Sequence, residues 1–396
     1  MKFVTPVSEL PVPDEDSLRH SQRLAGLIRD EIERQGGRIT FARYMELALY
    51  APGLGYYSAG LNKFGAAGDF VTAPEISPLF ARCVARQCRQ VLQALGSGDI
   101  LEFGAGSGAM AAELLAELEV LNSLPQQYFI LEISAELRER QRATLTQRIP
   151  HLLGRIIWLD EFPKQKLRGF AFANEVLDAM PVHRFQLDAE GISELYVAYE
   201  NDTFAWRAGP VNDPALAERI AEICAASPDL NPGYSSEINL AAPAWVQTVA
   251  AAIESGMLLL IDYGHPHHEL YHPQRACGTL LCHYRHHAHD DPFLYPGLQD
   301  ITAHVDFTAL AEAGYRSGLQ VAGYTTQANF LLGCGLTELA SVASADGVRQ
   351  RVQLAEQIKR LTLPGEMGEV FKVLALVHDS ADPLLGFKLR DLRARL

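Results

Sequence analysis

Hydrophobic and polar positions change their spacing several times along the chain, and these changes predict the order of its helices and strands. Leu24, Leu27, Ile28 and Ile32 recur at helical spacing within residues 17–50. Further on, short apolar runs alternate with helical runs. We expect strands at 100–103, 128–131, 156–159, 170–173 and 257–261. Helices are expected at 109–121 and at 241–254, and a further helix follows the strand at 128–131 and extends through Gln147. This alternation favours an α/β fold with a doubly wound, mostly parallel sheet covered on both faces.

Two other patterns modify this picture. Residues 184–210 alternate around the turn signals AEG and END, which predicts an antiparallel hairpin inserted in the α/β core. A last strand at 370–377 would close the sheet in the antiparallel direction. We therefore expect three parts, which are an N-terminal helical extension and cofactor lid (1–95), a Rossmann-like core (96–183 and 256–396) and an inserted substrate- or partner-binding subdomain (184–255).

Composition narrows the class of protein. The formal net charge of −14 argues against nucleic acid as a partner, because affinity for phosphates comes from Lys and Arg. No apolar stretch approaches the roughly 20 residues of a membrane span, and the first residues lack the apolar region of a secretory signal. The six cysteines show no CxxC spacing, which indicates reduced thiols. These features together lead us to expect a soluble, cytoplasmic protein, and they leave its oligomeric state open.

The stretch LEFGAGSGAM at 101–110 is a glycine turn between an expected strand and an expected helix. Gly104, Gly106 and Gly108, followed by Ala109, also fit a dinucleotide fingerprint. Glu102 separates the possible ligands, because a carboxylate beside the turn would repel a pyrophosphate. S-adenosylmethionine has no phosphate and carries a sulfonium and an ammonium group. The sequence therefore favours S-adenosylmethionine as cofactor over NAD.

The ends of the next strands add candidate cofactor contacts. Glu132, followed by Ile133, ends the second strand and could accept both ribose hydroxyls, a need that NAD shares. Asp160 follows the third strand and could accept from the adenine amino group, with a helix cap or a surface acid as an equal alternative. Asn174 follows the fourth strand and would meet the amino-acid end of the cofactor or shape the turn.

The segment after the fourth strand, NEVLDAMPVHRF, resembles the signature of the MidA-type methyltransferases, whose mitochondrial members are assembly factors for respiratory complex I. LYAPGLGYYS, GDFVTAPEISPLF, LEFGAGSG, IDYGHP and PGLQDITAHVDF match further motifs of that family in the same order, over roughly residues 40–310. The resemblance implies a class I methyltransferase fold with S-adenosylmethionine as donor. For the mitochondrial members it also implies methylation of a protein arginine.

Transfer to a cationic guanidinium would need carboxylates that hold its planar fork. Glu175 and Asp178 are our candidates for that catalytic role, and His183 for contact with the substrate or removal of the proton. A surface or hydrogen-bonded structural histidine is the alternative for His183. Glu237, Asp262, Tyr263 and His304 are candidate substrate-binding residues; alternatively, Glu237 is a cap, Tyr263 a packed aromatic residue and the segment of His304 a helix cap. Phe70 and Thr72 would point inward from a lid over the cofactor, and Pro74 with Glu75 also predicts the start of a helix.

Three other interpretations remain at this stage. Nine of the thirteen histidines lie between 265 and 304, which raises the possibility of a metal site, although HExxH and CxxC pairs are absent from the sequence. A loop with incidental histidines is favoured, so no metal is expected. An NAD-dependent oxidoreductase is the second alternative. The third is an assembly or interaction protein that binds the cofactor without turnover and holds a partner through 184–255.

Overall fold

The computed structural model describes residues 4–59, 72–343, 347–379 and 383–396. The chain divides into two compact units. Unit 1 comprises Met1–Phe70, Asp178–Pro243 and His265–Asp306, and unit 2 comprises Val71–Leu177, Ala244–Gly264 and Phe307–Leu396. Among the described residues, no helix has the length and apolar character that a membrane crossing requires.

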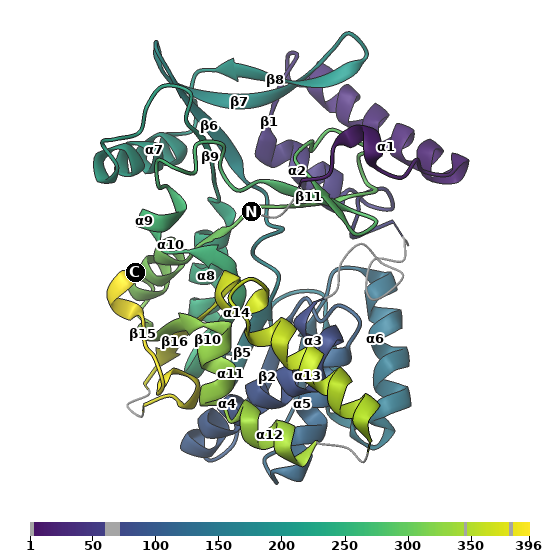
Figure 1. Ribbon diagram of the computed structural model, residues 1–396, viewed down its shortest axis with the longest axis vertical. Coiled ribbons are helices and arrows are strands. Elements are labelled where there is room, and N and C mark those ends of the chain that lie inside the picture. Colours follow the sequence, from purple (N-terminus) through teal and green to yellow (C-terminus); the bar gives the residue numbers. More distant parts are fainter. Residues whose placement is uncertain (1–3, 60–71, 344–346, 380–382) are drawn as a thin grey trace. The chain divides into compact units, whose positions relative to one another are not determined.

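Unit 2 is built on a sheet with the order β15-β16-β10-β5-β2-β3-β4 (Figure 1). Its strands are β2 (Asp99–Phe103), β3 (Tyr128–Leu131), β4 (Ile156–Leu159), β5 (Leu167–Asn174), β10 (Ile253–His265), β15 (Gln320–Thr326) and β16 (Phe371–His378). The pairs β10–β5, β5–β2, β2–β3 and β3–β4 are parallel, whereas β16 is antiparallel to both of its neighbours. The expected α/β class and the antiparallel closing strand are thus confirmed.

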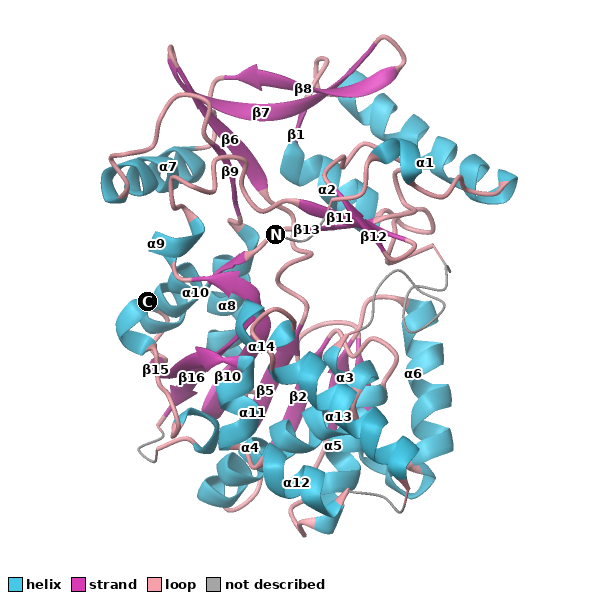
Figure 2. Ribbon diagram, viewed as in Figure 1, coloured by secondary structure: helices cyan, strands magenta, loops and turns pink. Residues whose placement is uncertain are grey.

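Helices cover both faces of this sheet, as Figure 2 shows. They are α3 (Ala73–Ile76), α4 (Pro78–Leu95), α5 (Ala109–Val120), α6 (Ala135–Arg148), α8 (Ala241–Ala252), α10 (Phe307–Arg316), α11 (Gln327–Gly333), α12 (Leu336–Val342), α13 (Val348–Thr362) and α14 (Met367–Val370). Local sequence sets their ends. Before α4, the Ser77 hydroxyl accepts from the Leu79 amide, and Gly96 ends the helix in the left-handed conformation at φ 77°.

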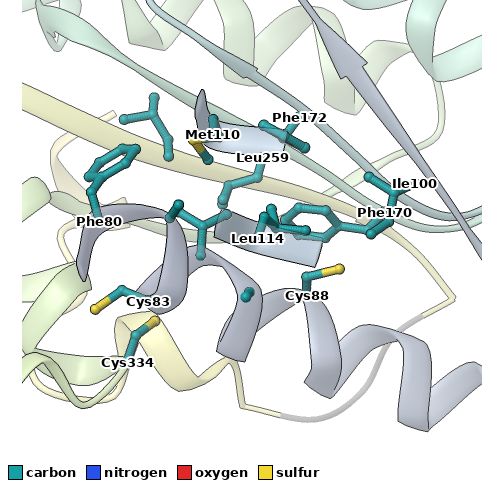
Figure 3. Close-up of a cluster of buried hydrophobic side chains, with 14 of the residues drawn as sticks. Phe80, Cys83, Cys88, Ile100, Met110, Leu114, Phe170, Phe172, Leu259 and Cys334 are labelled. Atoms are coloured by element: carbon teal, nitrogen blue, oxygen red, sulfur yellow. The ribbon is translucent and has the colours of Figure 1, made fainter. Parts of the chain in front are cut away.

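Alternation along the strands assigns residues to the two faces. Phe170 and Phe172 of β5 pack with Leu114 of α5 and Phe80 of α4 in the large core on one face (Figure 3). On the other face, the Phe103 ring lies 4.8 Å from the ring of Trp245 in α8. Successive strand residues point to opposite faces, so burial of both sets explains why these strands read as continuous apolar runs.

Unit 1 contains a sheet of order β1-β7-β6-β9, with β8 paired to β7, and a small sheet of order β12-β11-β13. The bounds are β1 (Ile39–Thr40), β6 (His183–Asp188), β7 (Gly191–Glu200), β8 (Thr203–Gly209), β9 (Ser235–Ile238), β11 (Leu281–Tyr284), β12 (His287–His289) and β13 (Asp300–Thr302). Its helices are α1 (Glu15–Arg34), α2 (Phe41–Tyr50), α7 (Pro214–Ala226) and α9 (His267–Leu270). Short 3-10 turns lie at Val7–Glu9 in this unit and at Pro150–Arg155, Leu385–Phe387 and Arg393–Arg395 in unit 2. The two-residue strand β14 is Val305–Asp306.

The expected hairpin at 184–210 forms as the strands β6, β7 and β8, which pair antiparallel. The helical pattern at 17–50 is divided into α1 and α2, because Gly36 and Gly37 adopt positive φ between them. The two units do not coincide with the three expected segments, since unit 1 also takes in 265–306. The binding roles expected for 1–95 and 184–255 stay predictions.

Candidate active site

The glycine turn of unit 2 lies directly between β2 and α5. Gly104, Gly106 and Gly108 adopt φ values of 63°, 52° and 81°, which L-residues with a side chain rarely do. A Cβ on Gly104 would lie 3.0 Å from the Val176 side chain, and one on Gly108 would lie 3.1 Å from the Cα of Gln141. The turn therefore exposes backbone where a side chain would fill the space, at the N-terminus of a helix.

Glu102 is buried at the end of β2, two residues before this turn. The fully buried Tyr128 of β3 donates its hydroxyl to Oε2 of Glu102 over 2.8 Å. Burial raises the pKa of Glu102 to about 8, opposed by this hydrogen bond and reinforced by the negative charge of Glu132. A buried carboxyl of this kind is stabilised in its ionised form by a cation placed next to it.

Glu132 stands just beyond β3 and is held at both oxygens. Oε1 accepts from the Ser134 amide over 2.9 Å, and Oε2 accepts from the Gln141 side-chain amide over 3.1 Å. Burial raises its pKa, while these two hydrogen bonds act in the opposite direction. The next side chain, Ile133, is 71% exposed. Two fixed oxygens that each retain a lone pair suit a vicinal diol.

Arg138 of α6 joins the ends of β3 and β4. Its guanidinium donates to the backbone oxygen of Glu132 over 2.6 Å and to that of Leu159 over 2.5 Å. It also pairs with the Asp160 carboxylate at 2.7 Å. The Asp160 side chain is 88% exposed and follows β4 directly, so the expected adenine contact stays a prediction.

Glu175 follows β5 in a conformation that is rare for a residue with a side chain, at φ 54°. Its amide donates to the Ile261 oxygen of β10 over 3.0 Å. Its Oε1 accepts from the Ala73 amide (3.3 Å) and the Asn174 side chain (3.2 Å). The backbone thus accepts local strain to direct this carboxylate at the carboxyl end of the sheet, where ligands bind in α/β folds. Strain of this kind is common at functional positions.

Asp262 and Tyr263, near the end of β10, are engaged in packing. Asp262 is fully buried and accepts from the amides of Leu177 and Tyr263, both over 2.9 Å. The Tyr263 ring packs edge-on against Phe371 at 5.4 Å. Asp262 therefore fixes the backbone three residues beyond Asn174. Binding of substrate by either residue remains a prediction.

Four further candidates lie in unit 1. Asp178 is buried, and its backbone oxygen accepts from Ala303 over 3.0 Å. His183 lies 2.9 Å from the carboxylate of Glu194. Asp178 also lies near Tyr57, whose hydroxyl donates to the Asp300 carboxylate over 3.0 Å. Burial raises the pKa of Tyr57, and the negative charges of Asp300 and Asp178 raise it further.

Glu237 and His304, the other two, lie in contact with one loop of unit 1. Oε2 of Glu237 accepts from the Thr279 amide over 2.7 Å, and the Thr279 hydroxyl accepts from the His304 amide over 3.0 Å. Burial raises the pKa of Glu237, and the nearby Arg184 opposes this effect. The His304 ring stacks on that of His265 at 5.2 Å. These bonds show how both residues are held, and their substrate contacts stay predictions.

The expected lid can be followed only in part. Phe70 lies outside the described residues, whereas Thr72 precedes α3 as its N-terminal cap residue. In α3, the Glu75 carboxylate accepts from the hydroxyl of Ser107 in the glycine turn. Residues on both sides of this contact belong to family-like motifs, and Pro74–Glu75 also starts a helix, as the sequence predicts.

Sequence reasoning overlooked Tyr128, Arg138 and Gln141, which hold the carboxylates in place. Only Gln141 had a detectable signal, because Leu137, Gln141 and Leu145 share the buried face of α6 at intervals of four residues. In the histidine-rich segment, no group of three metal-ligating side chains comes together among the residues that the structure describes.

Residues 83–325 match the family described as "Putative S-adenosyl-L-methionine-dependent methyltransferase". The chain belongs to this family of methyltransferases. A crystal structure of a "likely methyl transferase" from Burkholderia thailandensis bound to S-adenosyl-homocysteine has a TM-score of 0.94 and 46% identity, with 98% of this chain and 100% of the other covered. The chain is thus an enzyme of the methyltransferase class whose cofactor is S-adenosylmethionine, and the oxidoreductase alternative is not favoured.

Curated relatives share lower identity over most of their length. "Protein arginine methyltransferase NDUFAF7, mitochondrial" from Danio rerio is 29% identical, with 86% of this chain and 84% of the relative covered. Its human counterpart is 27% identical, with 86% and 80% covered. The compartment in these names overturns the cytoplasmic expectation. The hydrophobic pattern of a chain's first residues does not by itself identify a compartment.

The residues of unit 2 fit S-adenosylmethionine. The glycine turn leaves room that a Cβ would occupy, and the buried Glu102 carboxyl suits a cation but not a pyrophosphate. Glu132 offers two oriented acceptors beyond the next strand. The cofactor expectation from the sequence is therefore confirmed at the level of its chemistry.

Proposed function

We propose that this methyltransferase transfers the donor's methyl group to an arginine side chain of a protein. The proposal is carried by the names of two relatives, the Danio rerio and human protein arginine methyltransferases, of whose lengths this chain covers 84% and 80%. The strained Glu175 at the carboxyl end of β5 supports it, because a guanidinium needs a fixed carboxylate partner.

In the proposed reaction, a guanidinium nitrogen forms a bond to the methyl carbon while the carbon–sulfur bond breaks and its electron pair passes to sulfur. The nitrogen then loses a proton. S-adenosylmethionine supplies the electrophilic methyl group when bound. Glu102 would meet its positive charge, Glu132 its ribose and Asn174 its amino-acid end.

The chain's own part in this step is orientation and charge. Glu175 would hold the guanidinium and direct one nitrogen toward the methyl group, and its geometry is set by the Ala73 amide and the Asn174 side chain. Asp178 would provide a second carboxylate. His183, which lies next to Glu194, would accept the released proton or contact the substrate.

The substrate assignment can be tested by label transfer. The chain is incubated with methyl-labelled donor and a hypomethylated cell extract, and labelled proteins are hydrolysed and their amino acids identified by mass spectrometry. Label is expected in methylarginine. Label in another residue would overturn the arginine assignment, and absence of label despite donor binding would support an interaction protein without turnover.

Glu175→Gln tests the role of this carboxylate. The variant keeps an oxygen that can accept from Ala73 but loses the negative charge, so transfer should fall at least roughly a hundredfold with the donor Kd changed less than about threefold. Glu139→Gln, on the exposed side of α6, is the control and should leave both unchanged. Equal losses in donor binding and transfer would contradict a role in holding the acceptor.

A further inference from the structure

Gln141 is a fully buried polar residue in the middle of α6. Its neighbours one turn away on the same face, Leu137 and Leu145, are buried apolar residues. Burying an amide among apolar side chains is unfavourable unless its hydrogen bonds are made. The contacts of Gln141 therefore indicate why an amide occupies this position.

The Gln141 side-chain amide forms three hydrogen bonds with described residues, and these lead to three separate parts of unit 2. Its nitrogen donates to the Gly106 oxygen in the glycine turn over 3.2 Å and to Oε2 of Glu132 over 3.1 Å. Its oxygen accepts from the Trp158 indole of β4 over 3.0 Å. An indole only donates, so the amide oxygen must face Trp158 and both N–H groups must face the two oxygens.

This arrangement links the two parts of the site that follow β2 and β3. The glycine turn and Glu132 belong to different strand ends, and the Gln141 amide bonds to both. Its backbone also lies against Gly108, where a Cβ would approach the Gln141 Cα to 3.1 Å. The side-chain amide that holds Glu132 therefore also holds the glycine turn.

We propose that Gln141 is a positioning residue that holds the Glu132 carboxylate in the orientation that accepts the donor's ribose hydroxyls. This inference rests on the proposed ribose role of Glu132. Ser134 fixes one oxygen and Gln141 the other, so each oxygen keeps a lone pair directed away from these donors. Without Gln141, Oε2 loses its donor and the carboxylate can rotate about its own side-chain bonds.

The test measures recognition of the hydroxyls separately from overall affinity. Kd values for S-adenosylhomocysteine and its 2′,3′-dideoxy analogue are measured by calorimetry with the full chain. The wild type should bind the dideoxy analogue roughly thirtyfold more weakly, as expected for hydrogen bonds to a charged acceptor. In Gln141→Leu this ratio should fall to roughly threefold. A residue that only stabilised the fold would weaken both ligands equally and leave the ratio unchanged.

Gln87→Leu is the matched control, because Gln87 is another fully buried glutamine of unit 2, bonded to Gln90 and Gly386. It should leave the ratio at its wild-type value. Trp158→Phe keeps an aromatic ring but removes the indole N–H that orients the amide, and it should lower the ratio by an intermediate amount. This variant also serves if Gln141→Leu does not fold.

Glu132→Gln separates the possible failures. A ratio that collapses in Glu132→Gln but not in Gln141→Leu or Trp158→Phe overturns the role of Gln141. A ratio that survives in Glu132→Gln shows that Glu132 does not read the ribose, and the inference falls with it. Neither result bears on the arginine acceptor, which is judged by label transfer.

Discussion

At the scale of single residues, Glu102 is a buried carboxyl near the end of β2. Its folded pKa of about 8 lies well above the ordinary value of 4.5 because burial disfavours the ionised form. Between these two values the folded chain keeps a proton that the unfolded chain has released. The contribution of Glu102 to stability therefore falls as pH rises from about 4.5 to about 8.

Glu102→Gln should remove this penalty while keeping an oxygen for the Tyr128 hydroxyl. We expect its free energy of unfolding to exceed that of the wild type by on the order of 1–3 kcal/mol at pH 8, and the gap to narrow toward pH 5. Donor affinity should weaken, because the cation loses its partner. Urea unfolding at pH 5, 6.5 and 8 measures the gap, and a gap that is independent of pH would contradict the explanation.

Residue-level reasoning from the sequence reached Glu102 and Glu132 because each follows a recognisable strand beside a turn. It could not reach Tyr128, since the bond to Glu102 crosses between strands that are 26 positions apart. The strain at Glu175 was equally inaccessible, because positive φ in a glutamate is imposed by surrounding structure and leaves no trace in composition.

At the scale of elements, the strands β2, β3, β4 and β5 were predictable because each is a short apolar run between turn signals. The strand β1 was not, because two residues paired with β7 carry no period. The strands β11 and β12 were also missed, since runs of four and three residues are too short to show a period. Helix α7 went unrecognised beside the stronger hairpin pattern.

The close approach of β5 and β10 at their first residues gives an element-scale prediction. A Cβ on Gly256 would lie 1.9 Å from the Gly169 oxygen, and Gly256 has φ 122°. Gly256→Ala should therefore lower the free energy of unfolding by about 3 kcal/mol or more, through strain and a forced separation of the strands. Gly154→Ala, where a Cβ meets nothing within 4 Å, is the control. A loss below about 1 kcal/mol for Gly256→Ala would contradict this account.

At the scale of the whole molecule, neither unit is a continuous piece of chain. The backbone passes between the units after residues 70, 177, 243, 264 and 306. Each unit has its own buried clusters, with Phe170 in that of unit 2 and Tyr44 in that of unit 1. Sequence reasoning expected one inserted segment, because a contiguous hairpin is visible in the pattern whereas the joining of distant segments is not.

This connectivity predicts a single unfolding transition. Trp206 lies in unit 1 and the other two tryptophans in unit 2, so a Trp158→Phe, Trp245→Phe variant reports on unit 1 alone. Bound at a concentration 100 times its Kd, S-adenosylhomocysteine should add about 2.7 kcal/mol to the free energy of unfolding. When this ligand is added, the urea midpoint measured by Trp206 fluorescence and the midpoint measured by far-ultraviolet circular dichroism should rise by the same amount. Separate midpoints would show that the units unfold independently.

The second and third segments of unit 1 each begin at the carboxyl end of a central strand of unit 2. Asp178–Pro243 follows β5, and His265–Asp306 begins at the last residue of β10. Insertions in either segment would thus interrupt none of the hydrogen bonds that register the parallel strands. During divergence, these segments could lengthen or change composition without altering the glycine turn and the ends of β2 and β3. Relatives with different protein targets would then differ mainly in what is inserted after these two strands.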